Sequence, residues 1–209
     1  MEAPKRALFS LMARQVLDSL AKRNIEGFYA DSKADALRLL LDMIPKDAVV
    51  SSGGSATLEE IGARDALHSH GCTYLDPNSV QGGKAMDAIA HEALGADYYL
   101  MSANAITYNG EIVNADGYGN RVAALIFGPG RVIIIAGMNK VVPTLEDAIR
   151  RVKTQAAPQI LLKFRPDGYA SYGELSAASE MAMSHLVITS MSTNKERIKV
   201  ILVGERVGF

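Results

Sequence analysis

A short turn segment between two apolar runs carries an unusual density of carboxylates and amides and one guanidinium. Carboxylates can carry protons or attack as nucleophiles, while amides and arginine can orient a polyhydroxy or phosphorylated ligand. We therefore predict Glu111 and Asp116 as catalytic candidates. The predicted ligand-binding side chains of this segment are Asn104, Thr107, Asn114, Asn120 and Arg121.

Part of this segment also has a structural interpretation. The dipeptide Asn109-Gly110 is the strongest short signal for a β-hairpin turn, and we favour that interpretation for these two residues. Asn114 and Asp116 could equally satisfy backbone groups of their own loop. For the other polar residues we expect a pocket, because the segment follows a predicted strand and open α/β sheets bind ligands at the carboxyl ends of strands.

A second candidate lies where a strand gives way to a helix, in the stretch SSGGSATLEEIG. Backbone N–H groups and the helix dipole at such a turn can receive a phosphate or a carboxylate. We predict ligand contacts from Gly53, Gly54, Ser55 and Thr57. The alternative is a tight turn in which Gly53 or Gly54 takes a positive φ and Ser55 or Thr57 caps the helix.

Lys140 follows a third apolar run, and we predict it as a cation for the same anionic ligand. A solvated loop lysine is the alternative. We expect Asn104, Glu111, Asp116 and Lys140 to converge on one cleft. No metal site is predicted, since the histidines lack zinc-ligand spacing and the single cysteine, Cys72, cannot form a thiolate cluster.

Hydrophobic periodicity supplies the elements that must position these residues. Apolar residues recur every four positions over residues 5–23 and predict an amphipathic N-terminal helix. Ser32 with Asp35 and Thr144 with Asp147 resemble capping boxes that open two further helices, and Pro158 sits just past the expected end of the second. Strands are predicted at residues 26–30, 48–51, 72–75, 97–103, 132–136, 186–190 and 198–203, and the last two are expected to return to the main sheet. The remaining helices begin near 58 and 85. This alternation predicts an α/β fold with a mostly parallel sheet flanked by helices.

Composition disfavours several classes of partner. The net charge of −1 at pH 7 gives no electrostatic case for nucleic acid or an anionic membrane, and the apolar runs are far shorter than a membrane span. The N-terminal segment lacks the continuous apolar stretch of a secretory signal, and a single cysteine suits a reducing compartment. We therefore expect a cytoplasmic protein with no nucleic-acid or membrane partner, and a homodimer on base rates.

Several long motifs together resemble one family. They are GGSATLEEIG, SANAITYNGEIVNADGYGNRVAALIFGP, IIIAGMNKVVPTLEDAIRRVK and RIKVILVGE. The chain resembles LUD-domain proteins of the lactate-utilization type over nearly its whole length, so we expect a single LUD domain over residues 1–209. The resemblance implies the NagB/RpiA/CoA-transferase-like α/β fold, in agreement with the pattern of strands and helices.

The resemblance also implies a metabolic setting. Members of the group are linked to growth on lactate, some beside an iron–sulfur enzyme that oxidises L-lactate to pyruvate. Close relatives often carry a cysteine-rich segment before the last strands, but residues 165–185 hold no cysteine here, so we expect no iron–sulfur cluster and no other cofactor. A more distant resemblance to sugar-phosphate isomerases places an aspartate where this chain has Asn104, and an amide cannot act as an ordinary carboxylate base.

Three functions are compatible with these residues. The leading hypothesis is a protein that binds a small anionic metabolite and serves in lactate or related organic-acid utilization. An enzyme is the first alternative, an isomerase or an acyl or CoA transferase acting on a sugar phosphate or CoA-type substrate through Glu111 or Asp116. The second alternative is a non-catalytic sensor or assembly subunit that retains the pocket.

Overall fold

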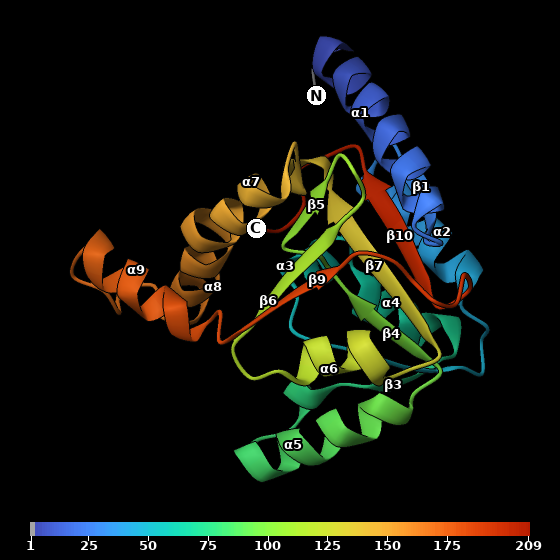
Figure 1. Cartoon of the computed structure of the whole chain (residues 1–209). Coiled ribbons are helices and arrows are strands. Elements are labelled where there is room, and N and C mark those ends of the chain that lie inside the picture. The colour runs from blue at the N-terminus through green and yellow to red at the C-terminus, as the bar shows by residue number, and fades with distance from the viewer. Residues whose placement is uncertain (1–2) are drawn as a thin grey trace.

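A six-stranded parallel sheet forms the centre of the computed structural model, which describes residues 3–209 (Figure 1). Its strands are β1 (Glu26–Ala30), β2 (Val49–Ser52), β3 (Thr73–Leu75), β4 (Tyr98–Met101), β7 (Arg131–Gly137) and β10 (Ile198–Val203). They lie in the order β1-β10-β7-β4-β2-β3, and every neighbouring pair is parallel. The predicted α/β fold class is confirmed.

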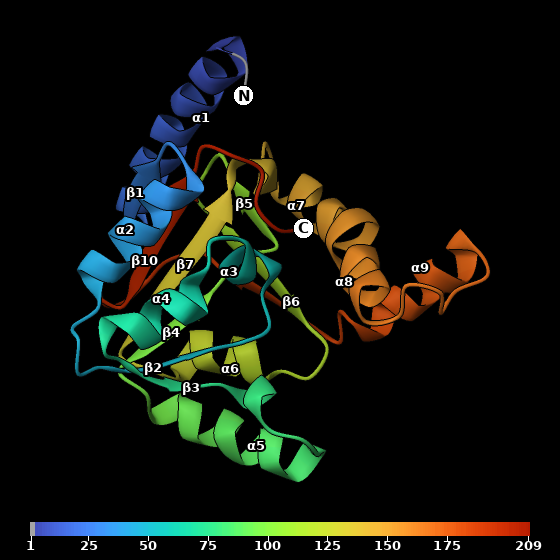
Figure 2. The ribbon, with the colours of Figure 1, turned by 180° about the vertical axis from the view of Figure 1, so that it is seen from behind.

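Both faces of this sheet are covered (Figures 1 and 2). The helices α2 (Lys33–Met43), α3 (Ala56–Glu60) and α4 (Ala63–His70) bury their apolar side chains against one face. The other face packs against α1 (Ala3–Lys22), α6 (Asn120–Phe127) and part of a second sheet. Because both faces are dry, the central strands are continuously apolar instead of alternating, as in Ile133, Ile134 and Ile135 of β7.

Local sequence signals set where several helices begin. The Ser32 hydroxyl accepts a hydrogen bond from the backbone N–H of Asp35 at 3.2 Å and caps α2. The Thr144 hydroxyl accepts from the N–H of Asp147 at 3.1 Å and caps α7 (Leu145–Arg151) in the same way. Both predicted caps are therefore confirmed. Two further helices are α5 (Gly83–Glu92) and α9 (Tyr172–Met181). Short 3₁₀ turns lie at Pro77–Ser79, Ala93–Gly95 and Met138–Lys140.

A second, four-stranded sheet was not predicted. It contains β5 (Ala105–Thr107), β6 (Ile112–Asp116), β8 (Val141–Val142) and β9 (His185–Thr189), in the order β8-β5-β6-β9. The Asn109-Gly110 turn joins β5 to β6 as an antiparallel hairpin, and Gly110 takes the left-handed φ of 85° that this turn requires. The expectation that residues 186–190 return to the main sheet is wrong, because β9 pairs antiparallel with β6.

The helix that begins after Thr144 does not end before Pro158. It continues from α7 through a stretch of π-helix (Val152–Ala156) into α8 (Ala157–Phe164). Proline lacks an N–H and its ring clashes with the carbonyl one turn earlier in a regular α-helix. The wider π turn, in which the N–H of Ala157 bonds to the carbonyl of Val152, lets the helix pass this residue.

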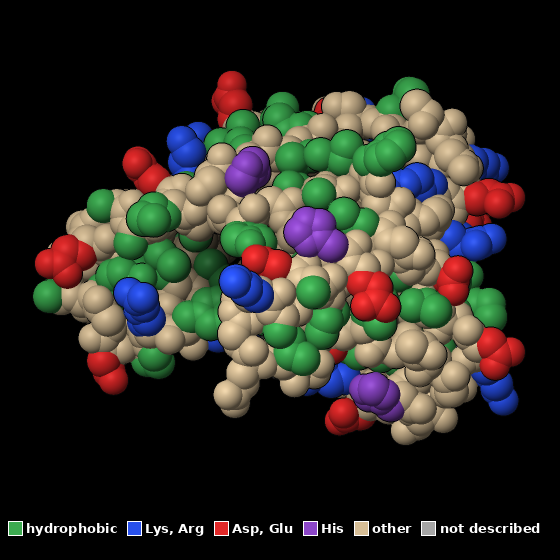
Figure 3. All heavy atoms as spheres, turned by 90° about the horizontal axis from the view of Figure 1, so that it is seen from below, with side chains coloured by type: hydrophobic (Ala, Val, Ile, Leu, Met, Phe, Trp, Pro, Cys, Tyr) green, Lys and Arg blue, Asp and Glu red, His purple; other side chains and the backbone are tan. Residues whose placement is uncertain are grey.

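The outer surface fits the balanced composition. Acidic and basic side chains are interspersed on the face seen from below, which is hollowed beside the left-hand part of the molecule where α8 and α9 stand in Figure 1 (Figure 3). No helix within residues 3–209 is long and apolar enough to cross a membrane.

Candidate functional site

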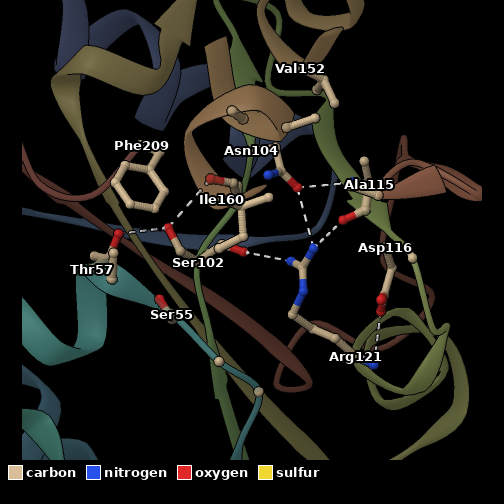
Figure 4. Close-up of a pocket in the computed structure, with 18 of the residues that line it drawn as sticks. Ser55, Thr57, Ser102, Asn104, Ala115, Asp116, Arg121, Val152, Ile160 and Phe209 are labelled. Atoms are coloured by element: carbon tan, nitrogen blue, oxygen red, sulfur yellow. Dashed lines mark hydrogen bonds between the residues drawn. The ribbon is translucent and has the colours of Figure 1, made fainter. Parts of the chain in front are cut away.

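A cavity of about 360 Å³ opens at the carboxyl ends of β2 and β4 (Figure 4). These neighbouring strands mark the point where the chain order of the sheet reverses, since the chain runs from β2 out to the edge strand β3 and returns on the other side to β4. Loops on the two sides of such a point diverge and leave a crevice, which is where open α/β sheets bind ligands. The sheet topology thus creates the site.

The cavity has a polar wall and an apolar wall. Loops after β2, β4, β6 and β7 supply the polar wall, whose functional side chains are Ser55, Thr57, Ser102, Asn104, Asp116, Asn120, Arg121 and Lys140. The helical segments after residue 152 and the last residue supply the apolar wall, formed by Val152, Ala156, Ala157, Ile160, Leu161, Phe164, Ala182 and Phe209. Such a cavity suits a ligand with one charged and one apolar part.

Lys140 lies in the polar wall, at the end of the turn that follows β7, with only 3% of its surface exposed. Its Nζ donates hydrogen bonds to Thr57 Oγ1 at 2.8 Å and to Ser102 Oγ at 2.9 Å. Ser102 Oγ in turn donates to the carbonyl of Ile135 at 2.6 Å. The alternative of a solvated loop lysine is therefore wrong.

The protonation of Lys140 is strongly perturbed. Burial lowers its pKa from 10.5 to about 7, helped by the positive charges of Arg151 and Arg121 and opposed by Glu60. Desolvation and like charges both disfavour the ammonium form. Near neutral pH Lys140 therefore exists as a mixture of amine and ammonium.

Arg121 extends from α6 into the cavity between β4 and β6 (Figure 4). One terminal nitrogen donates to Asn114 Oδ1 at 2.9 Å and to the Ser102 carbonyl at 3.3 Å. The other donates to Asn104 Oδ1 at 3.3 Å and to the carbonyl of Ala115. All four acceptors are neutral, so no ion pair holds the guanidinium. Burial lowers its pKa, and the negative charge of Asp116 opposes that shift.

Asp116 organises the start of α6. One carboxylate oxygen accepts from the backbone N–H of Tyr118 at 3.1 Å, and the other from those of Arg121 at 3.0 Å and Val122 at 3.1 Å. His185 contacts the Asp116 carbonyl through Nδ1 at 3.2 Å. The alternative in which Asp116 satisfies local backbone groups thus describes its contacts, and these contacts fix the helix that carries Arg121.

The glycine turn after β2 borders the cavity with Gly53, Gly54, Ser55 and Thr57. Ser55 accepts from the N–H of Leu58 at 3.3 Å and caps α3, which is only five residues long. Neither Gly53 nor Gly54 has a positive φ, so the turn-geometry explanation for these glycines is wrong. Gly53 instead permits a close approach, because a Cβ there would lie 3.1 Å from both Arg121 Cδ and the Tyr99 hydroxyl.

Three predicted site residues do not line the cavity: Glu111, Thr107 and Asn114. Of the four residues expected to converge, Asn104, Asp116 and Lys140 line it, and the expectation is wrong for Glu111. Glu111 pairs with Arg23 at 2.6 Å and contacts Thr107, on the hairpin away from the polar wall. Antiparallel pairing of β5 with β6 places the side chains of Thr107 and Glu111 at the hairpin turn. Asn114 is fully buried beneath Arg121, and its Nδ2 has no hydrogen-bond partner within the described chain.

Two comparisons with known proteins cover most of the chain. A family model described as the LUD domain matches residues 13–203. The chain belongs to the LUD-domain family. A crystal structure of a DUF162 family protein from Deinococcus radiodurans superposes with a TM-score of 0.57 at 16% identity, covering 93% of this chain and 98% of that one. The search of curated proteins gave no match.

The sequence analysis did not predict two polar residues at or beside the cavity of this LUD domain, Ser102 and Arg151, or the apolar wall of that cavity. Ser102 directly follows β4, so its position at a strand end could have identified it. Arg151 is 5% exposed and donates to the carbonyls of Asn139, at 3.2 Å, and Asn104. Burial, with the charge of Arg206, lowers its pKa to about 10. No local signal distinguishes Arg151 from Arg150, because its burial depends on how α7 packs.

Proposed function

We propose that this LUD-domain protein binds a small anionic metabolite in the cavity at the ends of β2 and β4, and serves in lactate or related organic-acid utilization. The observation that carries the proposal is the cluster of Arg121, Lys140 and Arg151, whose positive charges outnumber the nearby carboxylates Asp116 and Glu60. Among the ion pairs within residues 3–209, none involves Arg121, Lys140 or Arg151.

Desolvated cations without a counterion are costly, and an anion that enters the cavity relieves that cost. Arg121 donates four hydrogen bonds to neutral oxygens, which leaves its charge and its Nε–H for a ligand. Among the residues that the structure describes, Lys140 donates hydrogen bonds only to the hydroxyl groups of Thr57 and Ser102. An anion near both residues replaces a like-charge repulsion with two attractions, and therefore favours the protonated form of Lys140.

The size and the second wall of the cavity favour a small organic anion over an inorganic one. Its volume of about 360 Å³ lies near the lower end of the range for small-molecule sites. Ile160 and the Phe209 ring face the polar wall (Figure 4), and Leu161 lines the same cavity, so all three offer contact to an alkyl group. A carboxylic acid with a short apolar portion uses both walls.

The contacts of the two carboxylates favour binding over acid–base chemistry by either of them. Glu111 lies outside the cavity, and the Asp116 oxygens accept hydrogen bonds from three backbone N–H groups. Three of the roughly four lone pairs of the Asp116 carboxylate are therefore used to hold the start of α6. This leaves anion binding as the function best supported by the polar wall.

Isothermal titration calorimetry with lactate, pyruvate and inorganic phosphate tests the proposal. We expect the organic acids to bind, and to raise the thermal unfolding temperature by mass action. Binding should also take up protons near pH 7, seen as a heat that depends on the ionisation enthalpy of the buffer, because the anion raises the pKa of Lys140. Failure of every small carboxylate and phosphate to bind at millimolar concentration contradicts the proposal.

A further inference from the structure

We propose that Lys140 forms a reversible imine with the carbonyl carbon of a small 2-oxo acid whose carboxylate lies beside Arg121. This inference rests on the proposed function and names the substrate class for the same cavity. It adds a covalent step that simple anion binding does not require.

The first support is the placement of the amine. Lys140 is the only lysine that lines the cavity, and none of the described carboxylates pairs with it. Its Nζ is held by Thr57 Oγ1 and Ser102 Oγ, two groups that can exchange protons without neutralising a charge. A lysine that served only as a counterion for protein carboxylates would not be positioned in this way.

The second support is reactivity. Only the neutral amine attacks a carbonyl, and a desolvated lysine beside other cations supplies that form near neutral pH. The charged groups acting on Lys140 are Arg151 on α7, Arg121 on α6 and Glu60 on α3, and the two arginines lower its pKa to about 7 together with burial. Part of the population therefore presents a nucleophilic amine near pH 7. The carboxylate of a bound ligand raises this pKa, so the nucleophilic fraction in the complex is smaller and grows as pH rises above 7.

The third support is the spacing of the two groups. Lys140 and Arg121 both contact Ser102, the amine through Oγ at 2.9 Å and the guanidinium through the backbone carbonyl at 3.3 Å. In a 2-oxo acid the reactive carbonyl carbon is bonded directly to the carboxylate carbon, so a compact ligand can address both side chains. The remaining alkyl group then faces Ile160 and Leu161 on the apolar wall.

The step balances without any further reagent. The Nζ lone pair attacks the C2 carbonyl carbon, the C=O π electrons move to oxygen, and a proton passes from nitrogen to that oxygen to give a carbinolamine. The nitrogen lone pair then expels the hydroxyl group, which leaves as water after accepting a proton, while nitrogen loses its remaining proton. Hydroxyl groups of Thr57 and Ser102 lie within hydrogen-bond reach of Nζ and can relay these protons. The net reaction is amine plus ketone giving imine plus water. A 2-hydroxy acid has no ketone carbon that could form an imine, so it binds without a covalent step.

Borohydride trapping tests the inference with pyruvate as the probe. The intact protein is incubated with pyruvate and sodium borohydride, and the modified residue is located by peptide mass spectrometry. We expect a reduced pyruvate adduct on Lys140, no adduct with lactate, and a trapping rate that rises as pH increases through about 7. Lys163, an exposed lysine paired with Glu59, provides the matched control.

The variants Lys140→Arg and Lys163→Arg separate charge from nucleophilicity, because arginine stays protonated. We expect Lys140→Arg to lower the trapping rate at least tenfold and Lys163→Arg to leave it unchanged. If pyruvate binds to the wild-type protein by calorimetry but no adduct maps to Lys140, the imine is overturned and the proposed function stands. If pyruvate, lactate and phosphate all fail to bind, the proposed function is contradicted as well. The mapped wild-type adduct decides the question even if Lys140→Arg does not fold.

Discussion

Lys140 Nζ lies 2.8 Å from Thr57 Oγ1, although 83 residues separate them in the sequence. The pair joins the loop after β7 to the turn after β2, and Ser102 adds the end of β4 through a hydrogen bond of 2.9 Å to the same Nζ. A single amine therefore links three strand ends of the parallel sheet.

The pH dependence of stability should reveal the buried amine. The pKa of Lys140 is lowered from 10.5 to about 7, so between these values the unfolded chain binds a proton that the folded chain does not. The folded state therefore gains stability as pH rises above about 7, by at most about 1.4 kcal/mol per pH unit. The penalty is fully present at lower pH. In Lys140→Met this gain should be absent, as measured by urea unfolding of both proteins from about pH 6 to 9. Parallel pH profiles for the two proteins would show that the amine titrates normally.

Arg121 should dominate the affinity for anions. Arg121→Met removes the charge and the hydrogen bonds to four oxygens, of which Asn104 Oδ1 keeps the backbone N–H of Ala115 as a donor. We therefore expect anion affinity to fall at least about tenfold and the free energy of unfolding to fall by about 1–3 kcal/mol. Arg121→Lys keeps the positive charge but loses the planar set of guanidinium donors, so it should retain part of the anion affinity. Calorimetry measures the affinity, and Arg38→Lys on the exposed face of α2 is the control. Unchanged affinity in Arg121→Met would place the anion elsewhere.

The two predicted carboxylates should behave differently. Asp116→Asn replaces an acceptor oxygen by a donor at a cap that holds three backbone N–H groups, so it should lower the free energy of unfolding by about 1–3 kcal/mol and weaken anion binding through α6. Glu111→Gln loses one part-exposed ion pair with Arg23, worth about 1 kcal/mol or less. It should leave affinity unchanged. A large loss of ligand affinity in Glu111→Gln alone would reverse this ranking.

Replacing Gly208 by a larger residue should destabilise the protein. This glycine has a left-handed φ of 60°, and an added Cβ would lie 3.0 Å from Lys140 Nζ and closer still to Thr57 Oγ1. We expect Gly208→Ala to lower the free energy of unfolding by about 1–2 kcal/mol and to weaken anion binding, because it disturbs the Lys140–Thr57 pair. Gly130→Ala is the matched control, since its Cβ would meet open space and its φ is ordinary. Equal thermal melting and equal affinity in the two variants would contradict a role for this contact.

Much of the fold was predictable because its signals are local. The caps at Ser32 and Thr144 and the Asn109-Gly110 hairpin depend on contacts within a few residues, and all three are present. Pro158 shows the limit of such signals. A proline usually ends a helix, but here one stretch of π-helix, packed against the second sheet through Val152, carries the helix past it.

The sequence by itself determined the alternation of apolar strands and amphipathic helices, and hence that the polar segments after β2, β4 and β7 lie at one edge of a parallel sheet. The sequence also determined which residue types lie at this edge, because the polar residues directly follow β2, β4 and β7 along the chain. Only the tertiary structure decided which side chains share the cavity. Pairing of β5 with β6 places Glu111 outside the cavity, next to Arg23. Burial beside Arg121 and Arg151 lowers the pKa of Lys140 to about 7. Strand pairing and desolvation arise from residues distant in sequence, so no local pattern encodes them.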